Sequence, residues 1–580
     1  MSRSQDQAES RVLLPGFGLP LNLDAAKNNK LFPTILDEPS PYMPLTTLRE
    51  FTMMNLMNQL TDKPDWAVKV NNPEIASKWR EEALSTPNVD ITERMVEYCI
   101  SELQHKAQLL QQYNAISVFH GDVVKSDTIV PDFLRLALIE AVRPLEDVPP
   151  KYQDWHPRSD DKVLDLVHPS LFPLLYGCSR VLLNERTTLD DCIEKCGEGE
   201  VVPVPPEPPY AKVGWHPVHK PFSLAFQWLP CEVDISNGDT KITSYINNLH
   251  PRYKELYGLI EQVISYAIPL WNVTLSPSRA GYNLRIWYTS CQYDPDPENG
   301  PATDGPQQLE GEDENTYWYR RDDWYEQTRK VVQPEPAGFM PEPQELPVDL
   351  RNEFAQTGLQ VIVKLANIVL TPDKPNYEGG TWHVEGQLNE HICATALYYY
   401  DNDNVTASHL AFRQRVNDQD ADDVDYEQHH NDWLPEVFGC TNWSSTVQDV
   451  GKIETKQGRL LTFPNLLQHQ VQPFRLLDPT KPGHRKILAL FLVDPNVKII
   501  STANVPCQRI DWWKEAIQNG PERFKIPIEL QDRILDEVKG FPLSMEEAKR
   551  LRLQLMDERS AFQTSQDEVF QRDHFSLCEH

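Results

Sequence analysis

Apolar residues in this chain recur with two different periods, which separate helical parts from strand-rich parts. An apolar residue at every third or fourth position is typical of an amphipathic helix, whereas short runs of β-branched and aromatic residues favour strands. The helical period predicts helices at 46–60, 91–113, 131–142 and 252–268, from residue 511, and over 527–564. Strand-like runs occur at 222–235, 241–249, 282–293, 359–370 and 487–493. The pattern therefore predicts a strand-rich centre with helical regions at both ends.

Breaks in this pattern suggest four segments. We expect a helical N-terminal region at 1–196, a Pro-rich connector at 197–217, a strand-rich core at 218–510 and a helical C-terminal region at 511–580. Two acidic insertions, at 294–347 and 415–433, interrupt the core. The first is Pro-rich and is predicted to be solvated, apart from a short helix in WYRRDDWYEQ. Residues after Thr564 are expected to fray.

Composition narrows the class of protein. The 580 residues are 40% hydrophobic and 24% charged, which is typical of a soluble globular chain. A net charge of −31 argues against nucleic acid and against an anionic membrane surface as partners. No apolar run approaches the ~20 residues of a membrane span, and no signal peptide is evident. With ten scattered cysteines, a cytoplasmic or nuclear location is expected, and the oligomeric state is left open.

Candidate metal ligands lie in two separate motifs. YEGGTWHVEG contains His383 and Glu385, which share one face if this stretch is a strand. GRLLTFPNLLQHQVQPF carries His469. Two histidines and one carboxylate form the facial triad that binds non-haem Fe(II) and leaves coordination sites open. These three residues are the predicted metal-binding and catalytic group. The alternative interpretation is that His383 and His469 are satisfied core histidines, with Glu385 on the rim.

A possible anchor for an anion follows the second motif. The strand-like segment GHRKILALFLVDP has Arg485 near its start. An arginine there would hold a dicarboxylate through the two parallel donors of its guanidinium group. Arg485 is therefore the predicted cosubstrate-binding residue.

His-x-Glu, a distant His and an Arg on the next strand resemble the core of the 2-oxoglutarate/Fe(II)-dependent dioxygenases. The resemblance covers roughly 359–495 and implies an α+β protein whose core is a double-stranded β-helix, or jelly roll. It also implies Fe(II), 2-oxoglutarate as cosubstrate, and O2, with hydroxylation of a small-molecule or amino-acid/peptide substrate and release of succinate and CO2. Across nearly its full length the chain also resembles an uncharacterised fungal family, which shares phrases such as TSYINNLHP and CTNWSSTVQD.

Two departures from the dioxygenase pattern matter. Most members have Asp where this chain has Glu385, and many have Ser two positions after the arginine, where this chain has Ile487. A second donor to the cosubstrate must then come from elsewhere, and Tyr398 and Thr395 in TALYYYD are the predicted candidates. WHVEG and LTFPNLLQH also resemble JmjC-type enzymes. Those hold 2-oxoglutarate with a Lys on the strand after His-x-Glu, but no Lys lies between Trp382 and Lys452.

Residues near the triad in sequence are candidates for lining a substrate pocket. We select Trp382, Asn389, Tyr399 and Asn367. Two other classes of function stay open: a cupin-like metal oxygenase that does not use 2-oxoglutarate, and a non-catalytic acidic scaffold that retains the barrel. Loss of Arg485 would cripple a 2-oxoglutarate enzyme and spare a cupin-like enzyme.

Overall fold

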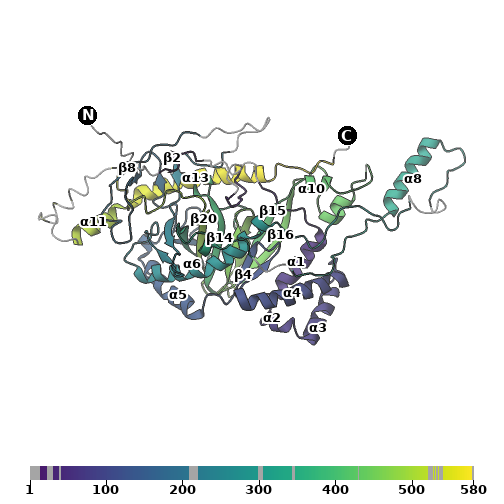
Figure 1. Ribbon diagram of the computed structural model, residues 1–580, viewed down its shortest axis with the longest axis horizontal. Coiled ribbons are helices and arrows are strands. Elements are labelled where there is room, and N and C mark those ends of the chain that lie inside the picture. Colours follow the sequence, from purple (N-terminus) through teal and green to yellow (C-terminus); the bar gives the residue numbers. More distant parts are fainter. Residues whose placement is uncertain are drawn as a thin grey trace, which may run out of the picture.

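The computed structural model describes residues 13–21, 30–37, 41–207, 220–297, 305–341, 346–428, 430–519, 527, 530, 533 and 540–577. It has a mixed α/β fold with antiparallel sheets at its centre (Figure 1). Three predictions fall partly outside the described residues: the end of the connector at 208–217, parts of the first acidic insertion, and most of the helix expected from 527.

The larger sheet has nine strands. Their order is β11-β10-β12-β20-β14-β17-β4-β3, and β5 also pairs with β12. The bounds are Ile116–Val118 (β3), Val123–Ser126 (β4), Val163–Val167 (β5), Cys231–Asp234 (β10), Lys241–Ile242 (β11), Leu359–Leu370 (β12), Ile392–Asp403 (β14), Leu460–Pro464 (β17) and Gly483–Val493 (β20). β12 coincides with the predicted strand at 359–370, and β20 contains the predicted run at 487–493.

A smaller, three-stranded sheet lies against the larger one. Its order is β16-β15-β18, with bounds Val447–Glu454 (β16), His409–Arg415 (β15) and Gln468–Val471 (β18). Apolar residues of both sheets share one buried cluster, so the main core lies between them. The remaining described strands form short two-stranded sheets. These pair Leu14–Pro15 (β1) with Gly18–Leu19 (β2), Leu174–Leu175 (β6) with Phe226–Gln227 (β9), Arg180–Val181 (β7) with Glu200–Val201 (β8), and Asn376–Tyr377 (β13) with Phe474–Arg475 (β19).

The α-helices lie outside the sheets. They are Leu48–Leu60 (α1), Trp66–Lys69 (α2), Pro73–Leu84 (α3), Glu93–Tyr113 (α4), Asp132–Glu146 (α5), Lys254–Leu275 (α6), Pro277–Ala280 (α7), Glu314–Thr328 (α8), Leu350–Glu353 (α9), Gln419–Asp422 (α10), Ile510–Asn519 (α11) and Met545–Phe570 (α13). α5 and α6 bury apolar side chains against the outer face of the larger sheet. α1–α4 form a separate cluster, and α8 projects away from the body (Figure 1).

Three predictions of secondary structure need correction. The N-terminal region is not only helical, because β3, β4 and β5 join the larger sheet. The predicted strand at 282–293 is not regular, and only isolated bridges occur there, at Ser290 and Tyr293. The chain beyond Thr564 does not fray in the described part, because α13 continues to Phe570 and that ring is fully buried. Long-range packing decides all three.

The second acidic insertion packs against the body. The Asp420 side chain accepts a hydrogen bond from the backbone N–H of Leu45, and Val424 and Trp433 are buried in the main core. The acidic insertion therefore also contains apolar residues that pack into the main core.

None of the described helices is both long and apolar enough to cross a membrane.

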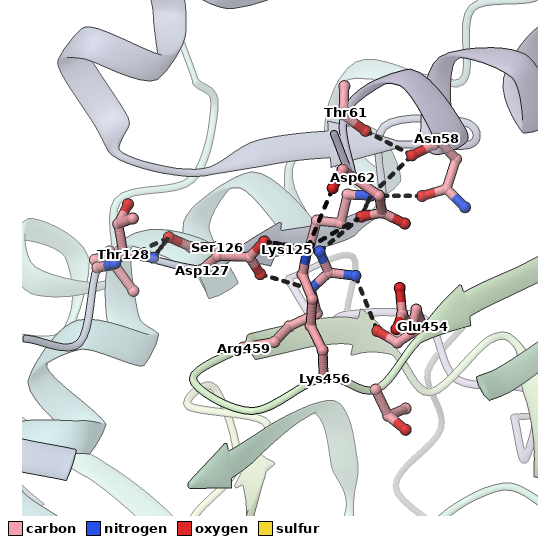
Figure 2. Close-up of polar contacts among 12 residues, drawn as sticks. Asn58, Thr61, Asp62, Lys125, Ser126, Asp127, Thr128, Glu454, Lys456 and Arg459 are labelled. Atoms are coloured by element: carbon pink, nitrogen blue, oxygen red, sulfur yellow. Dashed lines mark hydrogen bonds and ion pairs between the residues drawn. The ribbon is translucent and has the colours of Figure 1, made fainter. Parts of the chain in front are cut away.

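An ion network ties the helical N-terminal region to the strands (Figure 2). Arg459 is fully buried and donates to both carboxylate oxygens of Asp127, at 2.6 and 2.9 Å, and to Asp62 at 2.6 Å. Lys125 also donates to Asp62, at 2.6 Å, from the side of β4. Each buried charge thus has an opposite partner, as a stable buried network requires.

The capping box of α13 gives a first testable prediction. Ser544 accepts the N–H of Glu547 at 3.2 Å, and the Glu547 carboxylate accepts the N–H of Ser544 at 3.1 Å. Ser544→Ala is expected to destabilise α13 by about 1 kcal/mol, the usual cost of losing an N-cap. Hydrogen exchange of the α13 amides would measure this. Ser560→Ala, an exposed position within the helix, is the control and should change protection little.

Candidate metal centre

An isolated backbone bridge brings the two distant histidines together. His383 and His469 exchange two hydrogen bonds, N–H to O at 3.1 and 3.0 Å, as an antiparallel pair. His469 lies on β18, whereas His383 and Glu385 lie on an extended segment that forms no regular strand. The predicted strand at this motif is thus reduced to a single bridge. The bridge fixes both imidazoles on one side of the smaller sheet.

The three predicted ligands converge. One donor atom from each of His383, Glu385 and His469 lies within 4.8 Å of the other two. A Glu385 carboxylate oxygen is 3.8 Å from Nε2 of His383 and 3.3 Å from Nε2 of His469. Donors around one ion with bonds of about 2.0–2.2 Å lie roughly 3–4 Å apart. The arrangement therefore has the size of a metal site.

The hydrogen bonds of His383 leave its outer nitrogen available to a metal. Nδ1 of His383 lies 2.8 Å from the carbonyl oxygen of Thr381, a contact that requires Nδ1 to carry the proton. Nε2 then has a lone pair directed at the Glu385 side. A backbone carbonyl in this position is a common way to orient a metal-binding histidine.

The ring of His469 is buried beside two aromatic rings. Its centroid lies 6.5 Å from that of Phe412 and 4.7 Å from that of Phe463.

His383 and Glu385 also have, at neutral pH, the protonation states that metal binding requires. Burial, together with repulsion from His469, lowers the pKa of His383 to about 4. Burial alone would raise the pKa of Glu385, but a hydrogen bond from His469 and the charges of both histidines outweigh it and hold that pKa at about 2. Metal ligands must be deprotonated. His383 is neutral and Glu385 is ionised without any further rearrangement.

Asn465 holds the backbone around the carboxylate ligand. Its side-chain oxygen accepts the N–H of Glu385 at 2.9 Å, and its amide nitrogen donates to the carbonyl of Glu385 at 3.0 Å. Asn465 follows β17 in the phrase TFPN, so the strand that precedes His469 also positions Glu385. Sequence reasoning missed this residue.

Arg485 lies on β20 with no acidic partner among the described residues. It is fully buried, and its Nη1 donates to the hydroxyls of Ser408 at 2.8 Å and Thr455 at 3.1 Å. Nε and Nη2 have no hydrogen-bond partner within the part of the chain that the structure describes. The guanidinium also stacks over Phe474 at 4.6 Å. A buried cation with two unused donors is costly unless an anion can reach it.

Both proposed second donors to the cosubstrate were wrong. Tyr398 packs in the cluster beneath α5 and α6, on the opposite face of the larger sheet. Thr395 pairs with Phe491, six positions along β20 from Arg485, which corresponds to roughly 20 Å at ~3.3 Å per residue. Ser408 and Thr455, from the smaller sheet and its connections, are the hydroxyls that contact Arg485 instead.

Two of the four predicted pocket residues also point elsewhere. Asn389 is buried and bonds through its amide to the backbone of Ser223, so it is structural. Asn367 donates to Glu146 of α5 at 2.6 Å, on the outer face of the sheet. Tyr399 does lie on the inner face, with its ring 5.6 Å from the Arg485 guanidinium. Trp382 is half-buried beside the triad, under the guanidinium of Arg413 at 4.6 Å.

The described residues contain a second group of possible ligands. His156, Asp165 and His168 also have donor atoms within 4.8 Å of one another. Nδ1 of His168, however, accepts the N–H of Ser170 at 3.1 Å, so the other ring nitrogen carries the proton and has no lone pair. Arg552 also lies 3.4 Å from Asp165. In the second group His168 therefore offers no lone pair from its outer nitrogen, and Asp165 already has a cationic partner in Arg552.

Comparisons with known proteins identify a family and no activity. Residues 93–516 match the family described as "Protein of unknown function (DUF4246)", and residues 14–82 match its N-terminal domain, also of unknown function. No curated protein matches the chain.

Similarity to solved structures is weak. The chain is similar to the Fe(II)/α-ketoglutarate-dependent dioxygenase TqaL at 15% identity, covering 28% of this chain and 52% of that one, with a TM-score of 0.15. It is similar to EvdO2 from Micromonospora carbonacea var. aurantiaca in complex with 2-oxoglutarate at 9% identity, covering 23% and 52%, with a TM-score of 0.12. It is also similar to a bsmA homologue from Methylobium petroleophilum PM1 at 13% identity, covering 29% and 66%, with a TM-score of 0.16. The chain spans about half to two thirds of the length of these structures.

Proposed function

Since the chain belongs to the DUF4246 family, whose function is unknown, we propose from the site itself that it is a 2-oxoglutarate- and Fe(II)-dependent oxygenase. In this reaction O2, 2-oxoglutarate and a substrate C–H group give succinate, CO2 and a hydroxylated substrate, with one oxygen atom entering succinate and the other entering the substrate. The substrate is a small molecule, an amino acid or a peptide.

The observation that carries the proposal is the combination of a metal-ready triad with a buried arginine that lacks a counter-ion. His383, Glu385 and His469 provide the two imidazoles and one carboxylate typical of open Fe(II) sites. Arg485 provides two unused donors inside the same pair of sheets. A dicarboxylate that bridges the two would satisfy both, because one end would reach the metal and the other would accept from the guanidinium.

The strand order supports a double-stranded β-helix as the frame. β12, β20, β14 and β17 are neighbours in the larger sheet, while the His383 segment, β18, β15 and β16 are neighbours in the smaller one. Chain order therefore alternates between the sheets in the way that a jelly roll requires. In such a frame the inner faces of both sheets enclose the triad and Arg485.

Each residue has a defined task in the proposed reaction. His383, Glu385 and His469 would hold Fe(II), which supplies the activation of O2 and of the cosubstrate when bound. Arg485 would hold the distal carboxylate, and Ser408 and Thr455 orient its guanidinium through Nη1. Phe412 and Phe463 exclude water from the inner side of His469.

Titration of the purified protein with Mn(II), then with 2-oxoglutarate, tests the proposal. We expect the metal to bind first and 2-oxoglutarate to bind only to the metal-loaded protein, and we expect Fe(II) with O2 to release succinate. Metal binding without any 2-oxoglutarate binding would contradict the proposal and favour a metal oxygenase of the cupin-like type. Absence of metal binding would favour the alternative of a non-catalytic acidic scaffold that retains the barrel.

A further inference from the structure

The segment that carries His383 and Glu385 has a second side, which faces away from the triad. Its alternate residues, Trp382 and Val384, make their contacts there. Val384 is 3% exposed and belongs to one buried apolar cluster with Phe570 of α13. That cluster is separate from the main core between the two sheets. The C-terminal helix therefore packs behind the segment that supplies two of the three proposed ligands.

Arg413 of β15 contacts a neighbour of each histidine of the triad. Its guanidinium lies over the ring of Trp382, 4.6 Å from the centroid, and Trp382 precedes His383 in the chain. Its Nε donates to Oε1 of Gln468 at 2.6 Å, and Gln468 precedes His469. One side chain thus bridges the two segments whose histidines converge.

The strand register places Arg413 behind the triad. On β15, Phe412 pairs with His469, and their ring centroids lie 6.5 Å apart on the side of the triad. Arg413 pairs with Gln468 at the next position along both strands, so these two side chains point to the opposite side. Any mechanical effect of Arg413 on the metal centre therefore passes through the backbone that carries the ligands.

Helix α13 holds the same guanidinium. Nη2 of Arg413 donates to Oδ1 of Asp567, and the ring of Phe570 lies 5.5 Å from the guanidinium. The Arg413 side chain is 11% exposed, so its end of the ion pair is largely shielded from solvent, where attraction between charges is less screened. The position of α13 is thus linked to both histidine-bearing segments.

We propose that Arg413 is the positioning residue of the metal centre and that it couples metal affinity to the docking of α13. The inference rests on the proposed function and concerns the same site. The His383 segment forms no regular strand and pairs with His469 through one isolated bridge. Contacts of side chains, rather than a ladder of backbone hydrogen bonds, therefore maintain the separation of the two imidazoles, whose centroids lie 4.2 Å apart.

Positioning and charge make opposite predictions for the loss of Arg413. A cation near the site repels a metal ion, so removal of its charge alone would strengthen metal binding. Loss of an outer partner that orients metal ligands weakens metal binding, typically by about 10–100-fold. The sign of the change in affinity therefore decides between the two effects.

Calorimetric titration of the Arg413→Met protein with Mn(II) tests the inference. Methionine keeps an unbranched apolar side chain beside the rings of Trp382 and Phe570, and it removes the charge and the donors. We expect the affinity for Mn(II) to fall about tenfold. Unchanged or increased affinity would overturn the inference.

Arg415→Met separates positioning from a general loss of stability. Arg415 lies two residues further along β15, and its side chain is 5% exposed. It pairs with Asp573 at 3.5 Å and lies over the ring of Tyr42 at 4.5 Å, and neither partner is next to a triad residue in the chain. We expect Arg415→Met to bind Mn(II) as tightly as the unmodified protein, whatever its change in stability to urea. Equal weakening of Mn(II) binding in both variants would overturn the inference.

Asp567→Asn tests the coupling to α13 and keeps the inference testable if Arg413→Met does not fold. The Asp567 side chain is 35% exposed near the end of α13, so its replacement leaves the core intact. We expect Asp567→Asn to weaken Mn(II) binding about threefold, the scale of one partly exposed ion pair. It should have no further effect in Arg413→Met, because the two groups act as one pair. Full Mn(II) affinity in Asp567→Asn would contradict the coupling to α13.

Hydrogen exchange of the metal-free proteins distinguishes failure of this inference from failure of the proposed function. The amides of His383 and His469 donate the two hydrogen bonds of the bridge. We expect both amides to exchange faster in Arg413→Met than in Arg415→Met. If the unmodified protein binds no Mn(II), the proposed function is wrong, and faster exchange at these two amides would still support the positioning of both segments by Arg413. Mn(II) binding with unchanged affinity and unchanged exchange in Arg413→Met would contradict this inference alone.

Discussion

His383→Ala is expected to lower the affinity of the protein for Mn(II) or Fe(II) by about 100-fold or more, since loss of even an outer-shell partner of a metal ligand costs about 10–100-fold. Folding should survive, because the His383 side chain is 23% exposed and its ring makes one hydrogen bond, to the carbonyl of Thr381. Succinate release should fall with metal binding. Calorimetric titration with Mn(II) and a thermal melt of the same sample measure both quantities.

His156→Ala is the matched control for this experiment. His156 belongs to the second group of two histidines and one aspartate and has a similar side-chain exposure, 25%. Its ring bonds to Asp165, which also accepts from Arg552, and the neighbouring His168 uses Nδ1 to accept a backbone N–H. Metal affinity should therefore be unchanged in His156→Ala. If His156→Ala loses the metal and His383→Ala keeps it, the assignment of the metal centre is wrong.

The triad could be predicted from the sequence because its residues have a local signature. His383 and Glu385 are two positions apart, and His469 follows a strand that is buried throughout. β12 was predicted with its observed bounds for a similar reason: twelve residues of mostly β-branched and aliphatic type leave no alternative to a buried strand. Local patterns thus located both the three side chains that converge and the strand β12.

The face on which a side chain lies could not be predicted in the same way. β14 is buried on both sides, so Tyr398, Tyr399 and Tyr400 look alike in sequence. A strand between a second sheet and a layer of helices has no polar face to fix its orientation. Only the pairing with β20 shows that Tyr399 faces inward and Tyr398 outward. A register shift between Tyr399 and Asp401 further hides the alternation.

Contacts made by residues far apart in the chain were equally hidden. Ser408 lies just before β15 and Thr455 just after β16, and both contact Arg485. Asp165 lies opposite Ala366 because β5 pairs with β12. β5 lies in a region expected to be helical, so its pairing had no signal in local periodicity. These contacts therefore emerged only from the fold.

Arg459→Leu is expected to destabilise the protein by about 3–5 kcal/mol, the cost of removing one partner from a buried ion pair. Arg459 and Arg485 are both fully buried, but Arg459 pairs with Asp62 and Asp127, whereas among the described residues Arg485 contacts hydroxyls and rings and no carboxylate. Affinity for 2-oxoglutarate, per folded molecule, should not change in Arg459→Leu. This variant is therefore the control for the role of Arg485.

Arg485→Leu is expected to weaken 2-oxoglutarate binding by about 100-fold or more, because two charge-assisted hydrogen bonds of about 1.5–3 kcal/mol each would be lost from Nε and Nη2. Stability should be kept or increased, since leucine retains an apolar stem and removes a buried charge that has no counter-ion. Calorimetry on Mn(II)-loaded protein measures the affinity, and urea unfolding measures the stability. Unchanged 2-oxoglutarate affinity would remove Arg485 from the site and favour a metal enzyme that does not use this cosubstrate. A loss of stability as large as that of Arg459→Leu would instead identify Arg485 as a structural residue.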